Sequence, residues 1–445
     1  MTLRVAVVGA GPAGIYAADI LTKSDVDVSV DLFERLPAPF GLVRYGVAPD
    51  HPRIKEIIKA LQRVLAKPEV RFVGNVDFGT DVKLEDLNEF YDAVIFSTGA
   101  MADRDLRIPG EDLKRSYGAA DFVSWYDSHP DVPQTWDFGD GTHAAVIGVG
   151  NVALDVARVL AKTGDEMLVT DIPAQVHAGL KSKKITDVHV FARRGPAYAK
   201  FSPMELRELN HSPNVEVIVH PEGFEVDDHS MEHISKHKTH KLVLDILANW
   251  VGRDEEGKPH RIHLHFMEAP TEVLGENGEV VGLRTERTEL VGDGSVRGTG
   301  QFTDWPVQSV YRAVGYASSP LPGLPFDERA LVIPNEGGRV LGLDGQQIPG
   351  VFVTGWVKRG PVGLIGHTKS DAAETVGHVL ETATETATAR ETADVDAFLR
   401  ERGIDFITIT DWEKIDAKEI AQGEEQDRLR VKLPTREDMI GAARA

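Results

Sequence analysis

Residues 3–14, LRVAVVGAGPAG, decide the fold class of this 445-residue chain. The first six residues form a short, mostly apolar run, which is typical of a buried parallel strand. The run leads into Gly9-x-Gly11-x-x-Gly14 and then into an apolar segment ending at Leu21, which favours a helix. Glycines at this spacing let the backbone turn tightly and approach a pyrophosphate at a helix N-terminus. The stretch therefore predicts a dinucleotide-binding strand–turn–helix unit.

The strand that follows supports this prediction. Residues 28–33 predict a second strand that ends on Glu34, about 20 residues after Gly14, as the dinucleotide-binding fingerprint requires. A carboxylate at that position would hydrogen-bond the hydroxyls of a ribose. A glycine-rich turn in an ordinary α/β protein is the other interpretation, and the complete strand–turn–helix–strand context makes it the weaker one.

The same pattern returns later with a different ending. Residues 144–161 predict a strand, a glycine turn around Gly150 and a helix, and the strand at 188–192 ends on Arg193 and Arg194. Guanidinium groups bind a 2′-phosphate through paired charged hydrogen bonds, whereas a carboxylate would repel the phosphate. The second unit is therefore predicted to prefer NADP over NAD by about tenfold or more. Two arginines that merely cover a surface are the alternative.

Together these patterns predict an α/β fold with two Rossmann-like dinucleotide-binding domains. The first needs a later strand, residues 351–353, to complete its sheet, so the second is inserted into it. We expect a first domain of residues 1–105 and 319–445, including a C-terminal extension, and a second domain of residues 106–318. No room is left for a large domain that binds an organic substrate. The arrangement indicates an electron path in which one cofactor delivers a hydride to a tightly held flavin.

Composition narrows the class of protein. Lys and Arg number 49 against 70 Asp and Glu, a net charge of −21, which argues against general nucleic-acid binding. The chain has no cysteine, which excludes disulfide scaffolds, Cys-ligated metal centres and a redox-active dithiol. No apolar run approaches the 18 or more residues of a membrane span. We expect a soluble cytoplasmic protein.

Four longer motifs carry a family resemblance. They are PFGLVRYGVAPDHP at 39–52, GNVALDVAR at 150–158, RRGP at 193–196 and GWVKRGPVGLIG at 355–366. The chain resembles, over nearly its full length, the adrenodoxin reductase-like ferredoxin–NADP+ reductases, which have the glutathione reductase-type fold. The resemblance implies a non-covalent FAD on the first domain, NADP(H) on the second, and electron exchange with a ferredoxin-type iron–sulfur protein.

The resemblance also places the cofactors. Segment 40–42 and Val47 should pass close to the flavin, and a helix beginning near Leu364 would point N–H groups at the edge of the ring where negative charge builds on reduction. The FAD residues are predicted to be Gly9, Gly11, Pro12, Ala13, Gly14, Glu34, Arg35, Gly41, Leu42, Val47, Thr98, Gly99, Trp356, Gly363, Leu364 and Ile365. The NADP(H) residues are predicted to be Gly150, Asn151, Val152, Arg193, Arg194, Glu205 and Gly363.

His51 and Glu208 are the candidate catalytic residues. Glu205 and Glu208, three apart on a predicted helix, share a face. The resemblance pairs Glu208 with His51 and gives the pair a role in handling protons. Hydride transfer needs geometry rather than a base, so we expect these residues to tune flavin protonation and cofactor placement without being indispensable. A structural histidine before a helix that Pro52 begins is the alternative for His51.

Two features bear on partner docking. Residues 53–67 predict an amphipathic helix with a basic stripe, which could attract an acidic ferredoxin or be a solvated face. The stripe consists of Lys55, Lys59, Arg63 and Lys67. After a predicted helix at 241–247, where adrenodoxin-type reductases use arginines for docking, the chain instead has Ala248-Asn249-Trp250.

The remaining histidines are predicted to have no functional role. His233, His237 and His240 could resemble a metal cluster, but the lysines around them favour a solvated polar segment, and no metal is predicted. His263 and His265 alternate with apolar residues and are predicted to lie on the solvent face of a strand.

The sequence therefore predicts an NADPH–ferredoxin oxidoreductase. A hydride passes from NADPH to FAD N5, and single electrons then pass to the iron–sulfur partner. We expect a monomer that forms transient redox complexes. An FAD- and NADPH-dependent monooxygenase, and an electron-transfer subunit of a larger complex, are the alternatives.

Overall fold

The computed structural model describes residues 2–362, 365–386 and 394–445, which form two compact units. Unit 1 contains the residues up to 102, a short segment at 127–132 and the residues from 316 onward. Unit 2 contains residues 103–126 and 133–315. The chain leaves unit 1 within β5 (Ala102–Asp103) and re-enters it at β15 (Tyr316–Ala317).

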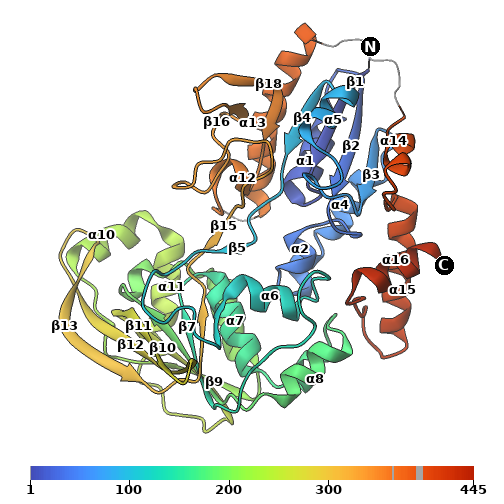
Figure 1. Cartoon of the computed structure of the whole chain (residues 1–445). Helices are drawn as coiled ribbons and strands as arrows, with labels where there is room; N and C mark the ends of the chain where they lie inside the picture. The colour runs from blue at the N-terminus through green and yellow to red at the C-terminus, as the bar shows by residue number, and fades with distance from the viewer. Residues whose placement is uncertain (1, 363–364, 387–393) are drawn as a thin grey trace. The chain divides into compact units, whose positions relative to one another are not determined.

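Unit 1 is built on a seven-stranded sheet in the order β16-β17-β18-β4-β1-β2-β3 (Figure 1). Its strands are β1 (Leu3–Val8), β2 (Val28–Glu34), β3 (Val70–Gly74), β4 (Ala93–Phe96), β16 (Asn335–Glu336), β17 (Arg339–Leu341) and β18 (Gln347–Val353). The run from β3 to β18 is parallel, and β17 and β16 add an antiparallel edge. Because β18 pairs with β4, the late strand completes the sheet as predicted.

The helices of unit 1 cover this sheet, and α1 packs against α13. They are α1 (Pro12–Leu21), α2 (Leu42–Tyr45), α3 (Pro52–Lys55), α4 (Ile58–Leu65), α5 (Leu84–Phe90), α12 (Trp356–Arg359), α13 (Ile365–Thr386), α14 (Val395–Glu401), α15 (Ile409–Glu424) and α16 (Arg436–Arg444). The prediction of one helix over 53–67 is wrong. The N–H groups of Ile57 and Lys59 bond to carbonyls three residues back, which tightens the chain and separates α3 from α4.

Unit 2 has a six-stranded parallel sheet in the order β6-β14-β7-β8-β10-β9. Its strands are β6 (Ser116–Gly118), β7 (His143–Ile147), β8 (Asp187–Ala192), β9 (Val215–Val219), β10 (His260–Phe266) and β14 (Ser309–Arg312). Its α-helices are α6 (Ala119–Tyr126), α7 (Asn151–Ala161), α8 (Ala174–Ser182), α9 (Pro203–Glu208), α10 (Asp228–Lys236) and α11 (Lys238–Ala248).

A second, antiparallel sheet of unit 2 contains β11 (Glu268–Glu276), β12 (Glu279–Leu290) and β13 (Val296–Trp305). The turn between β11 and β12 is formed by Asn277 and Gly278, which both have positive φ, as an Asn-Gly hairpin turn requires. The solvent-face prediction for His263 and His265 is wrong. His265 is 5% exposed, because β10 lies inside the parallel sheet and the ring of Trp305 from β13 packs 4.5 Å from its own.

The longest described helix is α13, with 22 residues. Within the described parts of the chain, we find no helix that combines the length and apolar character needed to span a membrane.

Candidate functional site: two nucleotide cradles

The first glycine turn has the shape that a pyrophosphate needs. A Cβ on Gly9, where φ is +109°, would lie 2.6 Å from the carbonyl oxygen of Ser97, and a Cβ on Gly14 would lie 2.1 Å from that of Gly9. These two glycines are therefore required by packing. A Cβ on Gly11 would meet only the Cα of Gly41, at 3.9 Å, so the chain is open where α1 begins. No side chain caps α1, and Pro12 occupies its first turn, with Ala13 buried behind it.

Glu34 ends β2 beside this turn. One of its carboxylate oxygens accepts the N–H of Ala10 at 2.8 Å and the other that of Leu36 at 3.1 Å. Burial raises the pKa of Glu34, and the bond from Ala10 opposes that rise. Each carboxylate oxygen keeps a second lone pair, which suits the hydroxyls of a ribose. Its neighbour Arg35 is exposed, with a guanidinium nitrogen 3.4 Å from Asp131.

Other predicted FAD residues lie at the ends of neighbouring elements in unit 1. Gly41 and Leu42 begin α2, and Val47 follows it. Thr98 and Gly99 come directly after β4, where Gly99 has a φ of +78° and open space around its Cβ position.

The predicted residues near α13 are only partly described. Trp356 begins α12, and its ring centroid lies 6.3 Å from that of Tyr316. Ile365 is the first residue of α13. Gly363 and Leu364 lie outside the described residues.

The second glycine turn repeats the geometry of the first. A Cβ on Gly148 would lie 2.2 Å from the carbonyl oxygen of Ala313, whereas nothing lies within 4 Å of a Cβ on Gly150. Gly150 begins α7 without a capping side chain. Asn151 and Val152 form the first turn of that helix, and the Asn151 side-chain oxygen accepts the N–H of Ser202 at 2.7 Å.

Arg193 and Arg194 follow β8 directly, as predicted. Arg193 is exposed, and its carbonyl accepts the hydroxyl of Thr288 at 2.7 Å. The guanidinium of Arg194 stacks 4.9 Å from the ring centroid of Tyr198. Two cationic residues thus follow the carboxyl end of β8 beside the open turn of α7, an arrangement that suits a phosphate. The sequence reasoning did not identify Tyr198.

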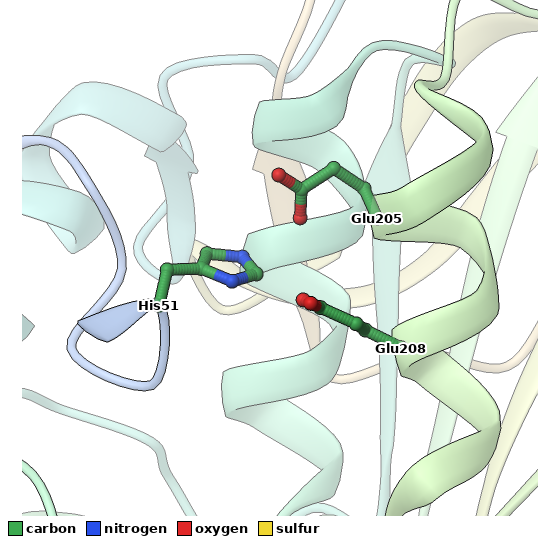
Figure 2. Close-up of side chains that lie close together, drawn as sticks. All are labelled: His51, Glu205 and Glu208. Carbon is green, nitrogen blue, oxygen red and sulfur yellow. The ribbon is translucent and has the colours of Figure 1, made fainter. Parts of the chain in front are cut away.

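Glu205 and Glu208 both belong to α9, and Figure 2 shows their carboxylates extending to the same side of that helix. The N–H of Glu205 donates to the Ser202 hydroxyl at 3.1 Å, which caps the helix. Glu205 is 4% exposed and lies 4.0 Å from a guanidinium nitrogen of Arg158. Ser202 is not among the predicted site residues, although Ser-Pro-Met-Glu at 202–205 matches the sequence pattern of a helix N-cap.

His51 belongs to unit 1, where it precedes Pro52 and caps α3 (Figure 2). It is 4% exposed. Its carbonyl accepts the N–H groups of Ile54 at 3.1 Å and Lys55 at 3.3 Å. The backbone of His51 therefore has a structural role at the start of α3, and its imidazole adds a titratable group to the buried part of unit 1.

The predicted basic stripe is largely neutralised. Lys55 contacts Asp127 at 3.3 Å, Lys59 contacts Glu56 at 3.4 Å, and Lys67 contacts Asp19 at 2.8 Å. Only Arg63 of the stripe lacks such a contact among those seen in the described residues. The stripe is therefore a weak candidate for attracting an acidic partner.

A groove in unit 2, of about 520 Å³, combines cations with an aromatic ring. It is lined by Arg207, Asn210, His211, Ile246, Asn249, Trp250 and Arg253. The guanidinium of Arg253 lies 5.5 Å from the Trp250 ring and donates to the Asn249 carbonyl at 2.9 Å. Asn249 and Trp250, from the segment that lacks the expected arginines, thus line a groove that Arg207 and Arg253 make basic. We name this feature the Arg207–Arg253 groove.

The histidines of α10 and α11 are linked to each other. Nε2 of His233 lies 2.7 Å from Nδ1 of His240, and the rings of His233 and His237 are 4.5 Å apart. Lowered pKa values of His233 and His240, caused first by burial and then by the neighbouring histidines, favour their neutral forms.

Two open glycine turns at helix N-termini, one beside a carboxylate and one beside two arginines, define a protein with two dinucleotide cradles. The family model described as pyridine nucleotide-disulphide oxidoreductase matches residues 3–258, and the chain belongs to this family. Despite the family's description, this chain has no cysteine.

Particular relatives cover the whole chain. The NADPH-ferredoxin reductase FprA of Mycobacterium tuberculosis is 40% identical over 98% of each chain. The mitochondrial NADPH:adrenodoxin oxidoreductase of Arabidopsis thaliana is 39% identical over 99% of this chain and 95% of its own. The structure of Mycobacterium tuberculosis FprA in complex with NADPH superposes with a TM-score of 0.92 over the full length of both chains, at 40% identity.

Proposed function

We propose that this chain is an NADPH–ferredoxin oxidoreductase that holds FAD in the cradle of unit 1 and NADP(H) in that of unit 2. The observation that carries the proposal is the end-to-end similarity to NADPH-ferredoxin reductase FprA, together with the pair of cradles. When bound, the flavin would accept a hydride, that is two electrons and a proton, and would pass the electrons on one at a time while the proton is released. Because the chain has no dithiol, the electrons must leave for an external acceptor.

The residues of the chain have separate roles in this proposal. Glu34 holds a ribose of FAD, and the open N-terminus of α1 holds its pyrophosphate. Arg193 and Arg194 hold the 2′-phosphate of NADPH, and Asn151, oriented by the bond from Ser202, lies at its pyrophosphate. These contacts orient the two cofactors, and orientation is what hydride transfer requires.

His51 and Glu208 are proposed to handle protons near the flavin. The matched variants are His51→Gln and Glu208→Gln, which keep side-chain size but remove titration. We expect the double variant to bind FAD and NADPH normally and to shift the pH profile of flavin reduction. An unchanged rate and pH profile would remove this role.

The partner is proposed to be an acidic ferredoxin-type protein that docks at the Arg207–Arg253 groove in a transient complex with a monomer. A chain with a net charge of −21 needs a local cationic surface to attract an acidic partner. The groove supplies two guanidinium groups beside a Trp ring, the composition that interface hot spots favour. A cytoplasmic location belongs to the same proposal and is checked by cell fractionation.

The deciding experiment is anaerobic titration of the purified protein with NADPH and, separately, NADH. We expect flavin absorbance bands that NADPH bleaches and NADH does not. Cytochrome c reduction that depends on an added [2Fe–2S] ferredoxin should follow. Fast oxygen consumption coupled to NADPH without a carrier would instead indicate a monooxygenase. Stable co-purification with a partner and poor activity alone would indicate a subunit of a larger complex.

A further inference from the structure

A buried ion pair joins the C-terminal segment of unit 1 to the short helix α2. Arg44 is 3% exposed and its partner Glu419, on α15, is fully buried. The two form a bidentate pair, with nitrogen–oxygen distances of 3.0 and 2.5 Å. Glu419 also accepts the N–H of Leu433 at 2.9 Å and a guanidinium bond from Arg430 at 3.2 Å. Buried pairs are weak sources of stability but restrict geometry strongly when fully hydrogen-bonded.

A second buried cation holds the same helix. Lys432 is 2% exposed, and its ammonium donates to the carbonyl of Arg44 at 2.7 Å and to the carbonyl of Asp127 at 2.9 Å. Helix α2 has only four residues, too few to be stable by local propensity. Its conformation therefore depends on groups supplied from nearly 400 positions further along the chain.

The backbone that enters α2 adopts an unfavourable conformation. Phe40 has a φ of +85°, a region that L side chains rarely adopt, and Gly41 follows with a φ of +49°. The N–H of Phe40 donates to the carbonyl of Ala10 at 2.8 Å, so this loop lies directly on the first nucleotide turn. The ring of Trp412, from α15, packs edge-on against the Phe40 ring with centroids 5.8 Å apart. Trp412 is 2% exposed.

We infer that Glu419 and Trp412 are positioning residues for the flavin: the C-terminal segment holds the strained Phe40–Gly41 loop in the conformation that the isoalloxazine ring requires. The inference rests on the proposed function and on the family resemblance, which implies that segment 40–42 passes close to the flavin; the Cα of Gly41 lies 3.9 Å from the position of a Cβ on Gly11. The pyrophosphate cradle at Gly9–Gly14 is also held by contacts from Ser97 and β1, in which the C-terminal segment takes no part. Loss of the segment's contacts should therefore disturb the ring more than the pyrophosphate.

The test uses the full-length protein with FAD bound. Trp412→Phe removes the indole that packs on Phe40, and Glu419→Gln removes one charge of the pair. Glu413→Gln is the matched control, because Glu413 makes the same chemical change at an exposed position on the same helix. Because an unpaired buried Arg44 can prevent folding, the double variant Arg44→Met with Glu419→Met replaces the pair by apolar groups.

Three readouts separate positioning from folding: the visible circular dichroism of the flavin, its midpoint potential and its dissociation rate. We expect altered dichroism, a shifted potential and dissociation faster by about tenfold, the size of effect that release of a strained residue gives. KM for NADPH should stay within about twofold, because a change confined to the flavin leaves the energy of NADPH binding unchanged. Glu413→Gln should match the wild type in every readout.

Lowered thermal stability with wild-type dichroism, potential and flavin dissociation would overturn the inference, because the C-terminal segment would then support folding alone. A wild-type protein that purifies without flavin and does not bind added FAD would contradict the proposed function, and this inference with it.

Discussion

Nδ1 of His189 lies 3.0 Å from Nε2 of His265, and this hydrogen bond is one link in a set of histidines on neighbouring strands of unit 2. His143 bonds to His189 at 3.1 Å, and His220 bonds to His263 at 3.1 Å. Burial first, and the neighbouring imidazoles next, lower the pKa of His189 to about 3 and that of His265 to about 2. His189 and His265 are therefore neutral in the folded protein at physiological pH.

This histidine set predicts acid sensitivity. An unfolded histidine titrates near pH 6.5, so below that pH the unfolded chain binds protons that folded His189 and His265 do not. Their contribution to stability is complete above about pH 6.5 and is lost as the pH falls toward 3. We expect each to lower the free energy of unfolding by about 1–2 kcal/mol between pH 7.5 and 5.

Urea unfolding at several pH values measures this loss. His265→Gln should flatten the dependence of stability on pH, because glutamine does not titrate. His211→Gln, at an exposed position outside the set, should keep the wild-type slope. Equal slopes in all three proteins would contradict the prediction.

Replacing Gly14 and Gly150 by alanine should have different effects. Gly14→Ala places a Cβ 2.1 Å from a backbone oxygen, so we expect a loss of about 1–3 kcal/mol and poor flavin retention. Gly150→Ala meets nothing within 4 Å and should change stability by less than about 0.5 kcal/mol. It should still raise the KM for NADPH by about tenfold, because the methyl group occupies the place of the pyrophosphate. Thermal melts and NADPH kinetics check both, with Gly441→Ala as the control.

Replacing Arg193 and Arg194 by alanine should relax the preference for NADPH. Each charged hydrogen bond to a 2′-phosphate contributes about 1.5–3 kcal/mol, so kcat/KM for NADPH should fall by about tenfold or more. The value for NADH should change little, because NADH has no 2′-phosphate. A parallel loss with both nucleotides would mean that the arginines support the fold instead.

Charge reversal in the Arg207–Arg253 groove should weaken binding of the partner without changing the reactivity of the flavin. Arg253→Glu should raise the KM for an acidic ferredoxin by about tenfold and reduce its dependence on salt. Reduction of ferricyanide, a small acceptor, should stay at the wild-type rate. Lys59→Glu is the control, because Lys59 lies in the neutralised stripe. A larger effect from Lys59→Glu would indicate instead that the partner docks on helix α4, which carries Lys59.

Local patterns predicted the elements that have local causes. Both glycine turns, the acid at the end of β2 and the arginines after β8 occur where the sequence places them, because each depends on a few neighbouring residues. The same reasoning was wrong where tertiary contacts decide. His265 alternates with apolar neighbours as an exposed strand residue would, yet β13 covers it. The helix at 53–67 has a continuous apolar period and is nevertheless interrupted.

By itself, the sequence determined the class of fold and its two nucleotide cradles, because glycine spacing and the residue that ends each strand act over a few positions. Only the tertiary structure decided which charged residues remain available to a partner. Lys55 and Lys67 resemble docking residues until distant carboxylates neutralise them, and Arg253 gains importance only from the groove around it. Tertiary structure likewise brought Glu419 onto Arg44. A charge acts through what lies within a few ångströms, and that neighbourhood is set by folding rather than by sequence order.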